Sequence, residues 1–465
     1  MRQLPEAFEQ RMKVLLGDSY DAFKESFENV HVHSLRVNTL KLDAEAFRQL
    51  IHFDLYPIPW LATGFYYEAD ERPGKHPLHD AGLYYIQEAS AMAVAEASGV
   101  SPGQKVLDLC AAPGGKSTQL AAMLNGEGLL IANEIHPARA KILSQNIERM
   151  GIVNAIVTNE KPDALSKRFV KFFDTIVVDA PCSGEGMFRK DPEALAQWTP
   201  DLVSMCAIRQ SDILDEAVKM LKDGGKLVYS TCTFAPDENE RQIANLLMRD
   251  PDLEIERLTA LKGLSPGLNL APPLPLSETK RIWPHLSKGE GHYLAVLRRR
   301  AGSNTPESIQ TDDNVNKKLA RQKNDNVSDA YWSAFEAFAH EVIDIMPKGK
   351  PTAFGEQLYL MPDAIEIKGL RVLRPGLHLG TVRKGRFEPS HALALALKAE
   401  AVKPSRRFML AIESPEVVKY LKGETLPYTG KKGWYVVMAG QYPIGWGKCS
   451  DGILKNHYPK GLRRV

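Results

Sequence analysis

The sequence predicts an α/β protein with a doubly wound, Rossmann-like core, a small α+β domain before it and a β-rich domain after it. Three observations predict this fold. Strand and helix signals alternate between residues 86 and 300. The strand signals are short runs rich in Val, Ile and Leu, as in parallel strands that are buried on both faces. Apolar residues then become scarce near residue 301.

The core elements follow one another along residues 86–300. Helical patterns separate the apolar runs, as they do where crossover helices join parallel strands. The predicted strands are Lys105–Leu109, Gly128–Asn133, Ala155–Thr158, Asp174–Val178, Gly225–Tyr229 and Tyr293–Arg298. The predicted helices are Ser117–Leu124, Pro137–Met150, Asp201–Leu221 and Asp237–Met248. In such a sheet, ligands bind at the carboxyl ends of the strands.

Residues 1–85 predict the small α+β domain. Pro5–Leu16 has the apolar spacing of an amphipathic helix, and Ser34–Leu40 alternates as a strand does. Asp43 is a helix-capping residue that precedes an apolar pattern including Phe47. None of these elements identifies a function by itself.

The chain after the core divides into three parts. Residues 301–326 contain no aromatic residue and few apolar ones, which predicts an exposed linker. Residues 327–400 predict a second α+β domain, which opens with a helix that carries Trp332, Phe335 and Phe338. Residues 401–465 carry short strand signals punctuated by Gly and Pro, which predicts a small β-rich domain.

Composition and charge exclude several classes of protein. The chain has 465 residues and a net charge of only +2, so it is not a simple polycation. Residues 401–465, however, hold twelve Lys and Arg against four Asp and Glu. This basic end suits either a polyanion such as nucleic acid or a solvated surface. No apolar run resembles a signal peptide or a membrane span, so we expect a cytoplasmic protein that crosses no membrane.

The cysteines argue against a disulfide framework and against a metal site. Five of them are spread along the chain without a Cys-x-x-Cys pair. Thiols kept reduced in a cytosol are free to take part in chemistry.

A turn of small residues follows the first core strand. It sits between strand and helix, where backbone N–H groups at the helix start can receive a polar or anionic ligand group. Two glycines permit unusual backbone angles and a close approach of the ligand. The turn lacks the first Gly of a phosphate-binding P-loop and is not a Gly-x-Gly-x-x-Gly sequence. Its residues are Cys110, Ala111, Ala112, Pro113, Gly114, Gly115 and Lys116.

Acidic residues follow the next two strands. Glu134 ends the second strand and lies 20 residues after Gly114, where a carboxylate can accept hydrogen bonds from two ribose hydroxyls. Either Asp163 or Glu160 follows the third strand and is a candidate for contact with an adenine edge. The two remain alternatives, because both lie in the same short loop.

Two cysteines follow the fourth and fifth core strands. Cys182 stands in Asp-Ala-Pro-Cys-Ser-Gly after Asp174–Val178, and Cys232 stands in Ser-Thr-Cys-Thr after Gly225–Tyr229. Parallel strands bring both to the same sheet edge, so we expect them to face one crevice together with Asp179. By contrast, Cys206 lies within a predicted helix, and we expect it and Cys449 to be buried packing residues.

A nucleoside-like cofactor site beside a cysteine indicates methyl transfer to a carbon atom that is a poor nucleophile. Cytosine C5 is such a carbon. A thiolate that adds to C6 makes C5 nucleophilic, and an acidic side chain near N3 stabilises the charge that develops on the ring. A base then removes the C5 proton and the thiol departs, a step in which a second thiol can assist.

These motifs together resemble the NOL1/NOP2/Sun family of RNA cytosine-C5 methyltransferases. The resemblance rests on the Cys110–Lys116 turn, on the Asp179–Gly184 and Ser230–Thr233 motifs, and on Arg281–His285 with Gly289–Tyr293. Arg36–Thr39 and Gln87–Met92 are similar to the N-terminal part of the family, so that the match spans residues 34–300.

The resemblance implies roles for individual residues. It implies S-adenosylmethionine as cofactor, bound by residues 110–116, with Glu134 on the ribose. Asp179 would contact the reactive end of the cofactor or the target base. Cys232 would be the nucleophile and Cys182 would help to release the product. Lys190 would approach the base or its phosphate.

The C-terminal residues resemble the PUA-like tail of the RsmF-type branch of the family, which acts on 16S ribosomal RNA. This implies ribosomal RNA of the small subunit as partner. Trp446 and Tyr458 would suit base stacking there. The basic residues expected to contact RNA are Lys448, Lys455, Lys460 and Arg463.

Alternative functions remain at this point. Transfer RNA is an alternative substrate within the same chemistry, and a non-catalytic ribosome-assembly protein is an alternative class. In a DNA cytosine methyltransferase the nucleophile would be Cys182, which the presence of Cys232 disfavours. A protein or small-molecule methyltransferase would need neither cysteine, and a nicotinamide dehydrogenase would need the missing glycine motif.

Overall fold

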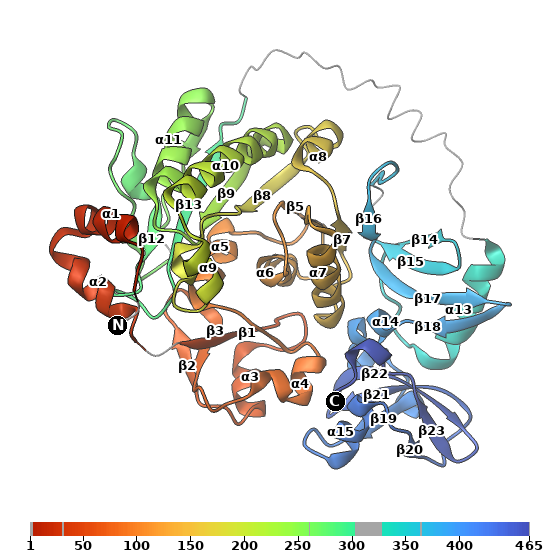
Figure 1. Cartoon of the computed structure of the whole chain (residues 1–465). Helices are drawn as coiled ribbons and strands as arrows, with labels where there is room; N and C mark the ends of the chain where they lie inside the picture. Colours follow the sequence, from red (N-terminus) through yellow and green to blue (C-terminus); the bar gives the residue numbers. More distant parts are fainter. Residues whose placement is uncertain (1–2, 30–31, 260, 303–327, 363–364, 465) are drawn as a thin grey trace. The chain divides into compact units, whose positions relative to one another are not determined.

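A computed structural model of the chain describes residues 3–29, 32–259, 261–302, 328–362 and 365–464 (Figure 1). The chain forms two compact units. The first comprises Met1–Gly74, Tyr84–Leu143 and Val157–Ala301, and the second comprises Lys75–Leu83, Ser144–Ile156 and Gly302–Val465. The predicted linker lies outside the described residues from residue 303 onward. The predicted domain boundaries at residues 85, 300 and 400 stay predictions.

The first unit begins with two helices and a small antiparallel sheet. The sheet has the strand order β2-β3-β1-β4. Asp43 caps α3 as predicted, because its side chain accepts a hydrogen bond from the Ala46 N–H at 2.7 Å. Phe8 of α1 and Phe23 of α2 are fully buried in an aromatic cluster with Phe188. The elements are α1 (Glu6–Leu16), α2 (Tyr20–Ser26), β1 (His33–Val37), α3 (Ala44–Leu50), β2 (Leu55–Ile58), β3 (Leu61–Tyr67) and β4 (Tyr84–Ile86).

The predicted Rossmann-like sheet is present in the first unit. Its strand order is β11-β12-β13-β9-β8-β5-β6-β7, and β6, β5, β8 and β9 pair in parallel. The order reverses between β5 and β8, and a ligand site is expected at such a switch point. The strands are β5 (Lys105–Asp108), β6 (Leu129–Asn133), β7 (Ala155–Thr158), β8 (Phe173–Asp179), β9 (Leu221–Thr231), β10 (Leu253–Ile255), β11 (Ser265–Pro266), β12 (Lys280–Ile282) and β13 (His292–Arg299).

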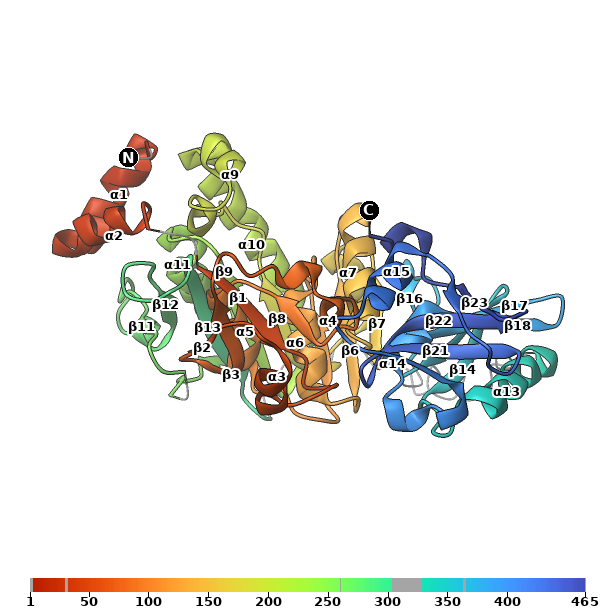
Figure 2. The ribbon, with the colours of Figure 1, turned by 90° about the horizontal axis from the view of Figure 1, so that it is seen from below.

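Helices cover both faces of this sheet, as a doubly wound fold requires. On one face α10 packs against β8, β9 and α8, and on the other α5 packs against β9, β13 and α6 (Figures 1 and 2). The helices are α5 (Ala89–Ser98), α6 (Gly115–Leu124), α7 (Pro137–Arg149), α8 (Pro162–Arg168), α9 (Pro192–Gln197), α10 (Pro200–Met220) and α11 (Glu240–Arg249).

One edge of the sheet differs from the prediction of a parallel sheet. β13 runs antiparallel to β9, with Tyr293 opposite Thr231, and β12 runs antiparallel to β13. The connection between β12 and β13 is too short to hold the crossover that parallel neighbours need, so these two strands run antiparallel. β13 lies between β12 and β9 and is antiparallel to both.

Two predicted elements also begin at different residues. β9 starts at Leu221, which pairs with Phe173, and is therefore longer than the predicted Gly225–Tyr229. The helix predicted from Asp237 starts only at Glu240, because Pro236–Glu238 form a separate 3-10 turn. That turn buries Glu238 completely.

The second unit contains two sheets that share one apolar core. The sheets have the orders β14-β15-β17-β18 and β19-β21-β22-β23-β20. Phe335 and Phe338 of α13 pack in this core with Trp434 and Trp446, so the predicted aromatic helix is present. The described helices are α4 (Pro77–Asp80), α13 (Asp329–Val342), α14 (His391–Ala396) and α15 (Pro415–Lys422). The strands are β14 (Lys350–Phe354), β15 (Gln357–Met361), β16 (Val372–Arg374), β17 (Leu377–Arg383), β18 (Arg386–Pro389), β19 (Arg407–Leu410), β20 (Leu426–Pro427), β21 (Gly433–Ala439), β22 (Tyr442–Ser450) and β23 (Ile453–Asn456).

The helices in the described part of the chain are those of a globular fold. None of them combines the length and the apolar character needed to cross a bilayer.

Candidate active site

A cavity of about 930 Å³ lies at the carboxyl ends of the parallel strands in the first unit. Its volume is within the range of small-molecule sites, which is roughly 300–1,000 Å³. Predicted site residues from five strand ends meet in it. These lining residues are Cys110, Ala112, Glu134, Asp163, Asp179, Cys182 and Cys232.

The turn after β5 forms one wall. Gly114 has φ +116°, a conformation that favours glycine, and it precedes the first turn of α6. Beneath the turn, Asp108 is fully buried and accepts a hydrogen bond from the Ser117 hydroxyl at 2.6 Å. Burial raises the pKa of Asp108 to about 7. Burial, together with the nearby Asp108 and Asp179 carboxylates, also raises the pKa of Cys110, so this thiol is a poor nucleophile candidate.

Arg36 lies in the N-terminal sheet and fixes this turn by hydrogen bonds. The sequence predicts no individual role for it. It is 1% exposed, and its guanidinium donates to the Gly115 carbonyl at 3.1 Å and to the Thr118 hydroxyl at 2.8 Å. It also donates to the Gln87 side chain at 3.2 Å. An arginine within a strand gives no sequence signal for such a contact, because Gly115 lies 79 residues further along the chain.

The acidic residues after β6 and β7 occupy different environments. Glu134 lines the cavity, and one of its carboxylate oxygens accepts a hydrogen bond from the His136 N–H at 2.9 Å. Asp163 also lines the cavity, with a half-exposed side chain paired to Lys167 at 3.1 Å. Glu160 is buried, and its N–H donates to the Asn133 side chain at 3.0 Å. Of the two alternatives for the adenine contact, Asp163 is thus the one that faces the cavity.

The structure brings the two predicted catalytic cysteines together. The Sγ atoms of Cys182 and Cys232 lie 3.3 Å apart, close enough for a hydrogen bond between the thiols. All described cysteines are free thiols, and Cys206 and Cys449 are buried, as predicted. The hydrogen bond to Cys232 and burial raise the pKa of Cys182 well above its ordinary value. Cys182 therefore remains a protonated thiol that can donate a hydrogen bond to its neighbour.

Asp179, the last residue of β8, lies beside the thiols in a polar cluster. It accepts hydrogen bonds from the Lys116 ammonium at 2.6 Å and from the Ser230 hydroxyl at 2.8 Å. Burial opposes ionisation of Asp179, but Lys116 and His292 outweigh it, so the pKa of this carboxyl lies well below its ordinary value. Asp179 is thus an ionised acceptor, and Lys116 is the donor beside it.

His292 belongs to a sequence motif of the family but has no predicted role of its own. It begins β13, the strand beside β9, and its Nε2 lies 3.6 Å from an Asp179 carboxylate oxygen. Ser90 lies 3.4 Å from the other ring nitrogen. The sequence signal that could have found it is its position directly before a strand that neighbours the Ser-Thr-Cys-Thr strand.

Lys190 and the predicted basic residues of the second unit do not line this cavity. Lys190 is exposed after a short 3-10 turn and its N–H donates to the Met187 carbonyl at 2.9 Å. In the second unit, Lys448, Lys455 and Lys460 are exposed, whereas Arg463 is only half-exposed. Their contacts with RNA stay predictions.

The expectation that Trp446 and Tyr458 stack on bases is wrong for this conformation. They are 1% and 3% exposed. Trp446 packs in the core of the second unit and donates to the Ser390 carbonyl at 2.7 Å. The Tyr458 hydroxyl donates to Asp80 at 3.0 Å. Both are internal because other rings pack against them: Phe338 and Trp434 against Trp446, and His391 and Tyr420 against Tyr458.

Potential metal ligands are dispersed over the described ranges of the chain. These ranges contain no group of three or more His, Cys, Asp or Glu side chains arranged to hold a metal ion.

Comparison with known proteins matches four families along the chain. Residues 98–298 match 16S rRNA methyltransferase RsmB/F, and residues 4–89 match the N-terminal domain of 16S rRNA methyltransferase RsmF. Residues 337–397 match the first C-terminal domain of RsmF, and residues 407–464 match the methyltransferase RsmF PUA domain. The C-terminal match confirms the predicted PUA-like domain.

Individual relatives agree with these matches. Ribosomal RNA small subunit methyltransferase F of Vibrio vulnificus is 33% identical, over 99% of this chain and 98% of its own length. A methyltransferase homologue of known structure from Pyrococcus horikoshii is 30% identical with a TM-score of 0.57, over 63% of this chain and 95% of its own. The structure of NSun6 from the same organism with SFG, an S-adenosylmethionine analogue, is 20% identical with a TM-score of 0.55, over 63% and 98%, and supports the fold alone.

Three findings agree. The chain is 33% identical to the Vibrio protein over nearly its full length, it has four consecutive family matches, and it has the methyltransferase fold. The chain therefore belongs to the RsmF-type branch of the NOL1/NOP2/Sun family, which consists of S-adenosylmethionine-dependent ribosomal RNA methyltransferases.

Proposed function

We propose that this protein transfers a methyl group from S-adenosylmethionine to C5 of a cytosine in 16S ribosomal RNA, through a covalent bond between Cys232 and C6. The observation that carries the proposal is the 3.3 Å separation of the Cys182 and Cys232 sulfur atoms, in a cavity that Glu134 and Asp179 also line. A methyltransferase acting on nitrogen or oxygen has no need of two adjacent thiols.

The cavity residues fit the cofactor. The Gly114 turn at the start of α6 leaves room for close approach of a ligand, and Glu134 lies one strand further along the same edge. We assign Glu134 to the ribose, residues 110–116 to the methionine and sugar portions, and Asp163 to the adenine. When bound, S-adenosylmethionine supplies the methyl group as an electrophile.

The chemistry at the base falls to Cys232 and Asp179. The Cys232 thiolate adds to C6, and the electron pair of the C5–C6 double bond becomes available at C5 for the methyl group. The ionised Asp179 carboxylate accepts a hydrogen bond from protonated N3 or from the exocyclic amine, so it stabilises the charge on the ring. Lys116 keeps that carboxylate ionised.

Product release needs two bonds to break. A base removes the C5 proton, the electron pair re-forms the C5–C6 double bond, and the Cys232 thiolate leaves. Cys182 stays protonated beside Cys232, so its S–H can donate to the sulfur that departs. The target base must be unstacked for C6 to reach Cys232.

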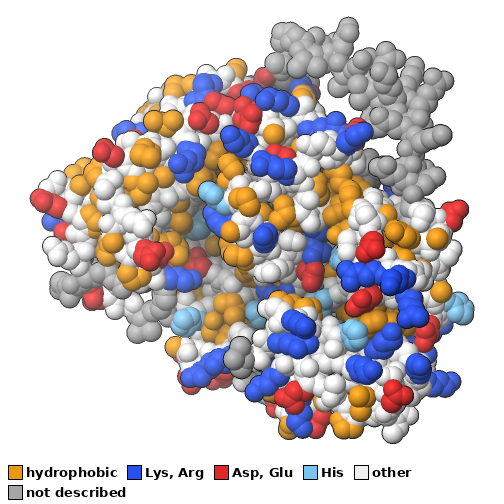
Figure 3. All heavy atoms as spheres, turned by 45° about the vertical axis from the view of Figure 1, so that its right-hand side comes forward, with side chains coloured by type: hydrophobic (Ala, Val, Ile, Leu, Met, Phe, Trp, Pro, Cys, Tyr) orange, Lys and Arg blue, Asp and Glu red, His pale blue; other side chains and the backbone are white. Residues whose placement is uncertain are grey.

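Two exposed lysines support an RNA-binding role for the PUA domain. Lys448 of β22 and Lys455 of β23 are directly opposite each other, a like-charge pairing that disfavours folding unless an anion binds there. On the face drawn in Figure 3, basic side chains occur in groups separated by acidic and apolar ones. We therefore infer local phosphate contacts rather than a field of one sign over the whole molecule.

The test compares wild type with Cys232→Ala and Cys182→Ala. Each is incubated with labelled S-adenosylmethionine and RNA from cells that lack this protein, as naked 16S RNA, small subunits or transfer RNA. We expect methyl transfer by wild type, and a denaturant-resistant protein–RNA adduct that accumulates with Cys182→Ala and is absent with Cys232→Ala. The reverse pattern would make Cys182 the nucleophile. Transfer only to transfer RNA would overturn the substrate, and no transfer to any RNA would favour an assembly protein.

A further inference from the structure

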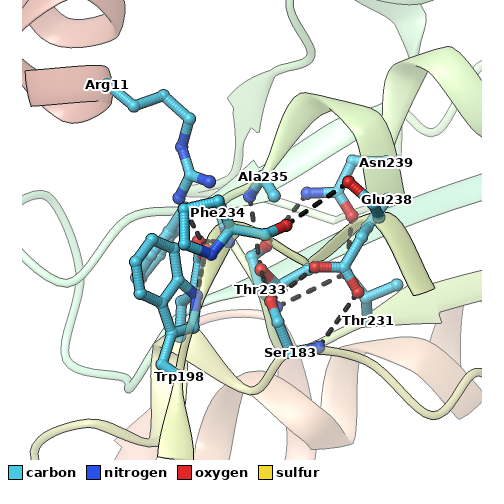
Figure 4. A network of polar contacts seen from close by, with 12 residues as sticks. Arg11, Ser183, Trp198, Thr231, Thr233, Phe234, Ala235, Glu238 and Asn239 are labelled. Carbon is cyan, nitrogen blue, oxygen red and sulfur yellow. Dashed lines mark hydrogen bonds and ion pairs between the residues drawn. The ribbon is translucent and has the colours of Figure 1, made fainter. Parts of the chain in front are cut away.

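A buried carboxylate outside the catalytic cavity connects the two cysteine loops. Glu238 belongs to the 3-10 turn Pro236–Glu238, six residues after Cys232, and is completely buried. None of the roles proposed above uses it. Its carboxylate contacts Ser183 in the loop Pro181–Ser183, which carries Cys182. Through the Ser183 hydroxyl it reaches the loop Thr231–Thr233, which carries Cys232 (Figure 4).

Glu238 holds the Cys182 loop through three donors. One carboxylate oxygen accepts hydrogen bonds from the Ser183 N–H at 3.0 Å and from the Gln210 amide at 2.8 Å. The other oxygen accepts the Ser183 hydroxyl in a short hydrogen bond. Gln210 also donates to the Pro181 carbonyl at 3.0 Å, so the residues on both sides of Cys182 are fixed by one group.

The same turn also holds the Cys232 loop. The Ser183 hydroxyl oxygen lies 2.9 Å from that of Thr233, the residue after Cys232. Asn239, directly after Glu238, accepts the Thr231 hydroxyl at 2.5 Å and donates to the Thr233 carbonyl at 2.9 Å. The residues that flank both cysteines are therefore bound to two consecutive side chains of one turn.

We propose that Glu238 is a positioning residue that sets the separation of the Cys182 and Cys232 thiols. This inference rests on the proposed function, because only a reaction that uses both thiols needs them at a fixed distance. Both cysteine loops leave the sheet at neighbouring strand ends, and pairing of Asp179 with Ser230 is the last registered contact between β8 and β9. Beyond that pair the ladder ends, and the Gly186 N–H, which donates to the Cys232 carbonyl at 2.8 Å, is a further backbone contact between the two segments.

The cost of burying this carboxylate favours a specific role. Burial raises the pKa of Glu238 to about 7, although the bonds from Ser183 and Gln210 lower it. An apolar side chain at the same place would fill the space without this cost. It could not, however, tie three donors, from the Cys182 loop and from α10, to one point.

Glutamine at this position provides a matched replacement. Its amide oxygen can accept from the Ser183 N–H and from Gln210, and its NH2 group can donate to the Ser183 hydroxyl, which then donates to Thr233. Glu238→Gln therefore keeps the connections, whereas Glu238→Ala removes all of them. Ser183→Ala removes the two contacts of the Ser183 hydroxyl, to Glu238 and to Thr233, but keeps the bonds of Glu238 to the Ser183 N–H and to Gln210. It serves as a milder variant if Glu238→Ala does not fold.

The first measurement needs no RNA. Phenylarsine oxide bridges two thiols only when they lie close together, whereas a maleimide reacts with each thiol singly. In the full-length protein we expect tight capture of one arsenical by the Cys182–Cys232 pair in wild type and Glu238→Gln. We expect capture to weaken at least tenfold in Glu238→Ala and severalfold in Ser183→Ala, with single-thiol labelling retained. Capture that is equally tight in Glu238→Ala and Ser183→Ala would overturn the proposal.

The second measurement is turnover on the RNA that wild type methylates. We expect kcat to fall at least tenfold in Glu238→Ala with the KM for S-adenosylmethionine unchanged, and to recover to within about threefold of wild type in Glu238→Gln. Leu246→Ala in the buried face of α11 is the stability control. If Leu246→Ala is as thermally stable as Glu238→Ala and loses as much kcat, Glu238 has only a structural role. If wild type forms no RNA adduct, the proposed function fails while the arsenical result still decides the positioning role.

Discussion

The Lys116 ammonium lies 2.6 Å from the Asp179 carboxylate, although the two residues come from different elements of the sheet edge. Lys116 belongs to the first turn of α6, and Asp179 ends β8. The Lys116 side chain is 11% exposed and that of Asp179 is 30% exposed, so solvent screens this ion pair only in part. The pair lies beside both thiols. Its charges therefore act on any substrate base that binds next to Cys232.

Removal of the cation should damage both stability and activity. We expect Lys116→Met to lower the free energy of unfolding by about 1–3 kcal/mol, because it leaves the Asp179 carboxylate without its main donor. It should lower kcat at least a hundredfold and raise the pKa of Asp179. Chemical denaturation and methyl-transfer rates measure the two effects.

The matched control is Lys167→Met. Lys167 also pairs with an aspartate, Asp163, but its side chain is 77% exposed, so the expected change in stability is below about 1 kcal/mol.

The pH dependence provides a second test of the Lys116–Asp179 pair. Asp179 has a depressed pKa, so its stabilising contribution is complete above its unfolded-state pKa and is lost only as the pH falls well below 4. An acid-side loss of activity between pH 5 and 7 should therefore appear in Lys116→Met and be absent from wild type.

The thiol pair should be sensitive to oxidation. One equivalent of hydrogen peroxide takes two hydrogen atoms from Cys182 and Cys232, leaving a disulfide and two molecules of water. The sulfur atoms are already 3.3 Å apart, so we expect this bond to form before any other in the protein. Peptide mapping identifies the bond, and dithiothreitol should restore methyl transfer.

Cys110→Ala is the control for this oxidation. Cys110 lines the same cavity but its pKa is raised, so its removal should leave the oxidation unchanged. A disulfide that includes Cys110 in the wild-type protein would contradict the arrangement of the three thiols described above.

Much of the catalytic edge could be predicted from the sequence because it depends on local order. A cysteine directly after an apolar run must lie at a strand end, and parallel strands collect their ends at one edge. The same reasoning predicts that Cys182, Cys232, Glu134 and Asp179 share one cavity, as the structure shows. The reversed strand β13 was missed because its direction depends on the path of the chain through β12, which periodicity does not reveal.

The residues that support the site could not be predicted in the same way. Arg36, Glu238 and His292 act through partners that are distant in sequence or lie across strands, and their own neighbourhoods look ordinary. The error over Trp446 has the same origin. An aromatic side chain among basic residues fits base stacking and core packing equally well, and only its 1% exposure distinguishes the two.

The pH dependence of folding should reveal the ionisation of Glu238. Its pKa in the folded protein is raised by burial to about 7, above the ordinary value of 4.5. The folded state therefore binds a proton that the unfolded state has released between these values, and the stability from this group falls as the pH rises through 7. Relative to Glu238→Gln, wild type should lose about 2 kcal/mol of unfolding free energy between pH 5 and pH 8.

Subtraction of the two curves isolates this one carboxyl. Asp108 has a similarly raised pKa, and half-buried His79 and His378 have lowered ones, but these groups are common to both proteins. Urea titrations at four pH values provide the unfolding free energies. Parallel curves for wild type and Glu238→Gln would mean that Glu238 is ionised in the folded as well as the unfolded state over this range, and would contradict a raised pKa.

The basic pair on the PUA domain should contribute to RNA affinity through charge alone. Lys448 and Lys455 are exposed and opposite each other on β22 and β23, and the Lys448 ammonium lies 4.9 Å from the centre of the Trp434 ring. Replacing both by Gln should weaken RNA binding and reduce the slope of log affinity against log salt by about 0.7–0.9 for each phosphate that the variant no longer neutralises. Filter binding across a salt series measures the RNA affinity and its salt slope. Cofactor affinity should not change.

The control is Lys398→Gln. Lys398 is an exposed lysine before a 3-10 turn in the same unit, and its replacement removes a charge elsewhere, so the slope should stay as in wild type. Because two like charges face each other across the strands, the double variant should also be at least as stable as wild type. A lower melting temperature together with an unchanged salt slope would assign these lysines to the fold rather than to the RNA interface.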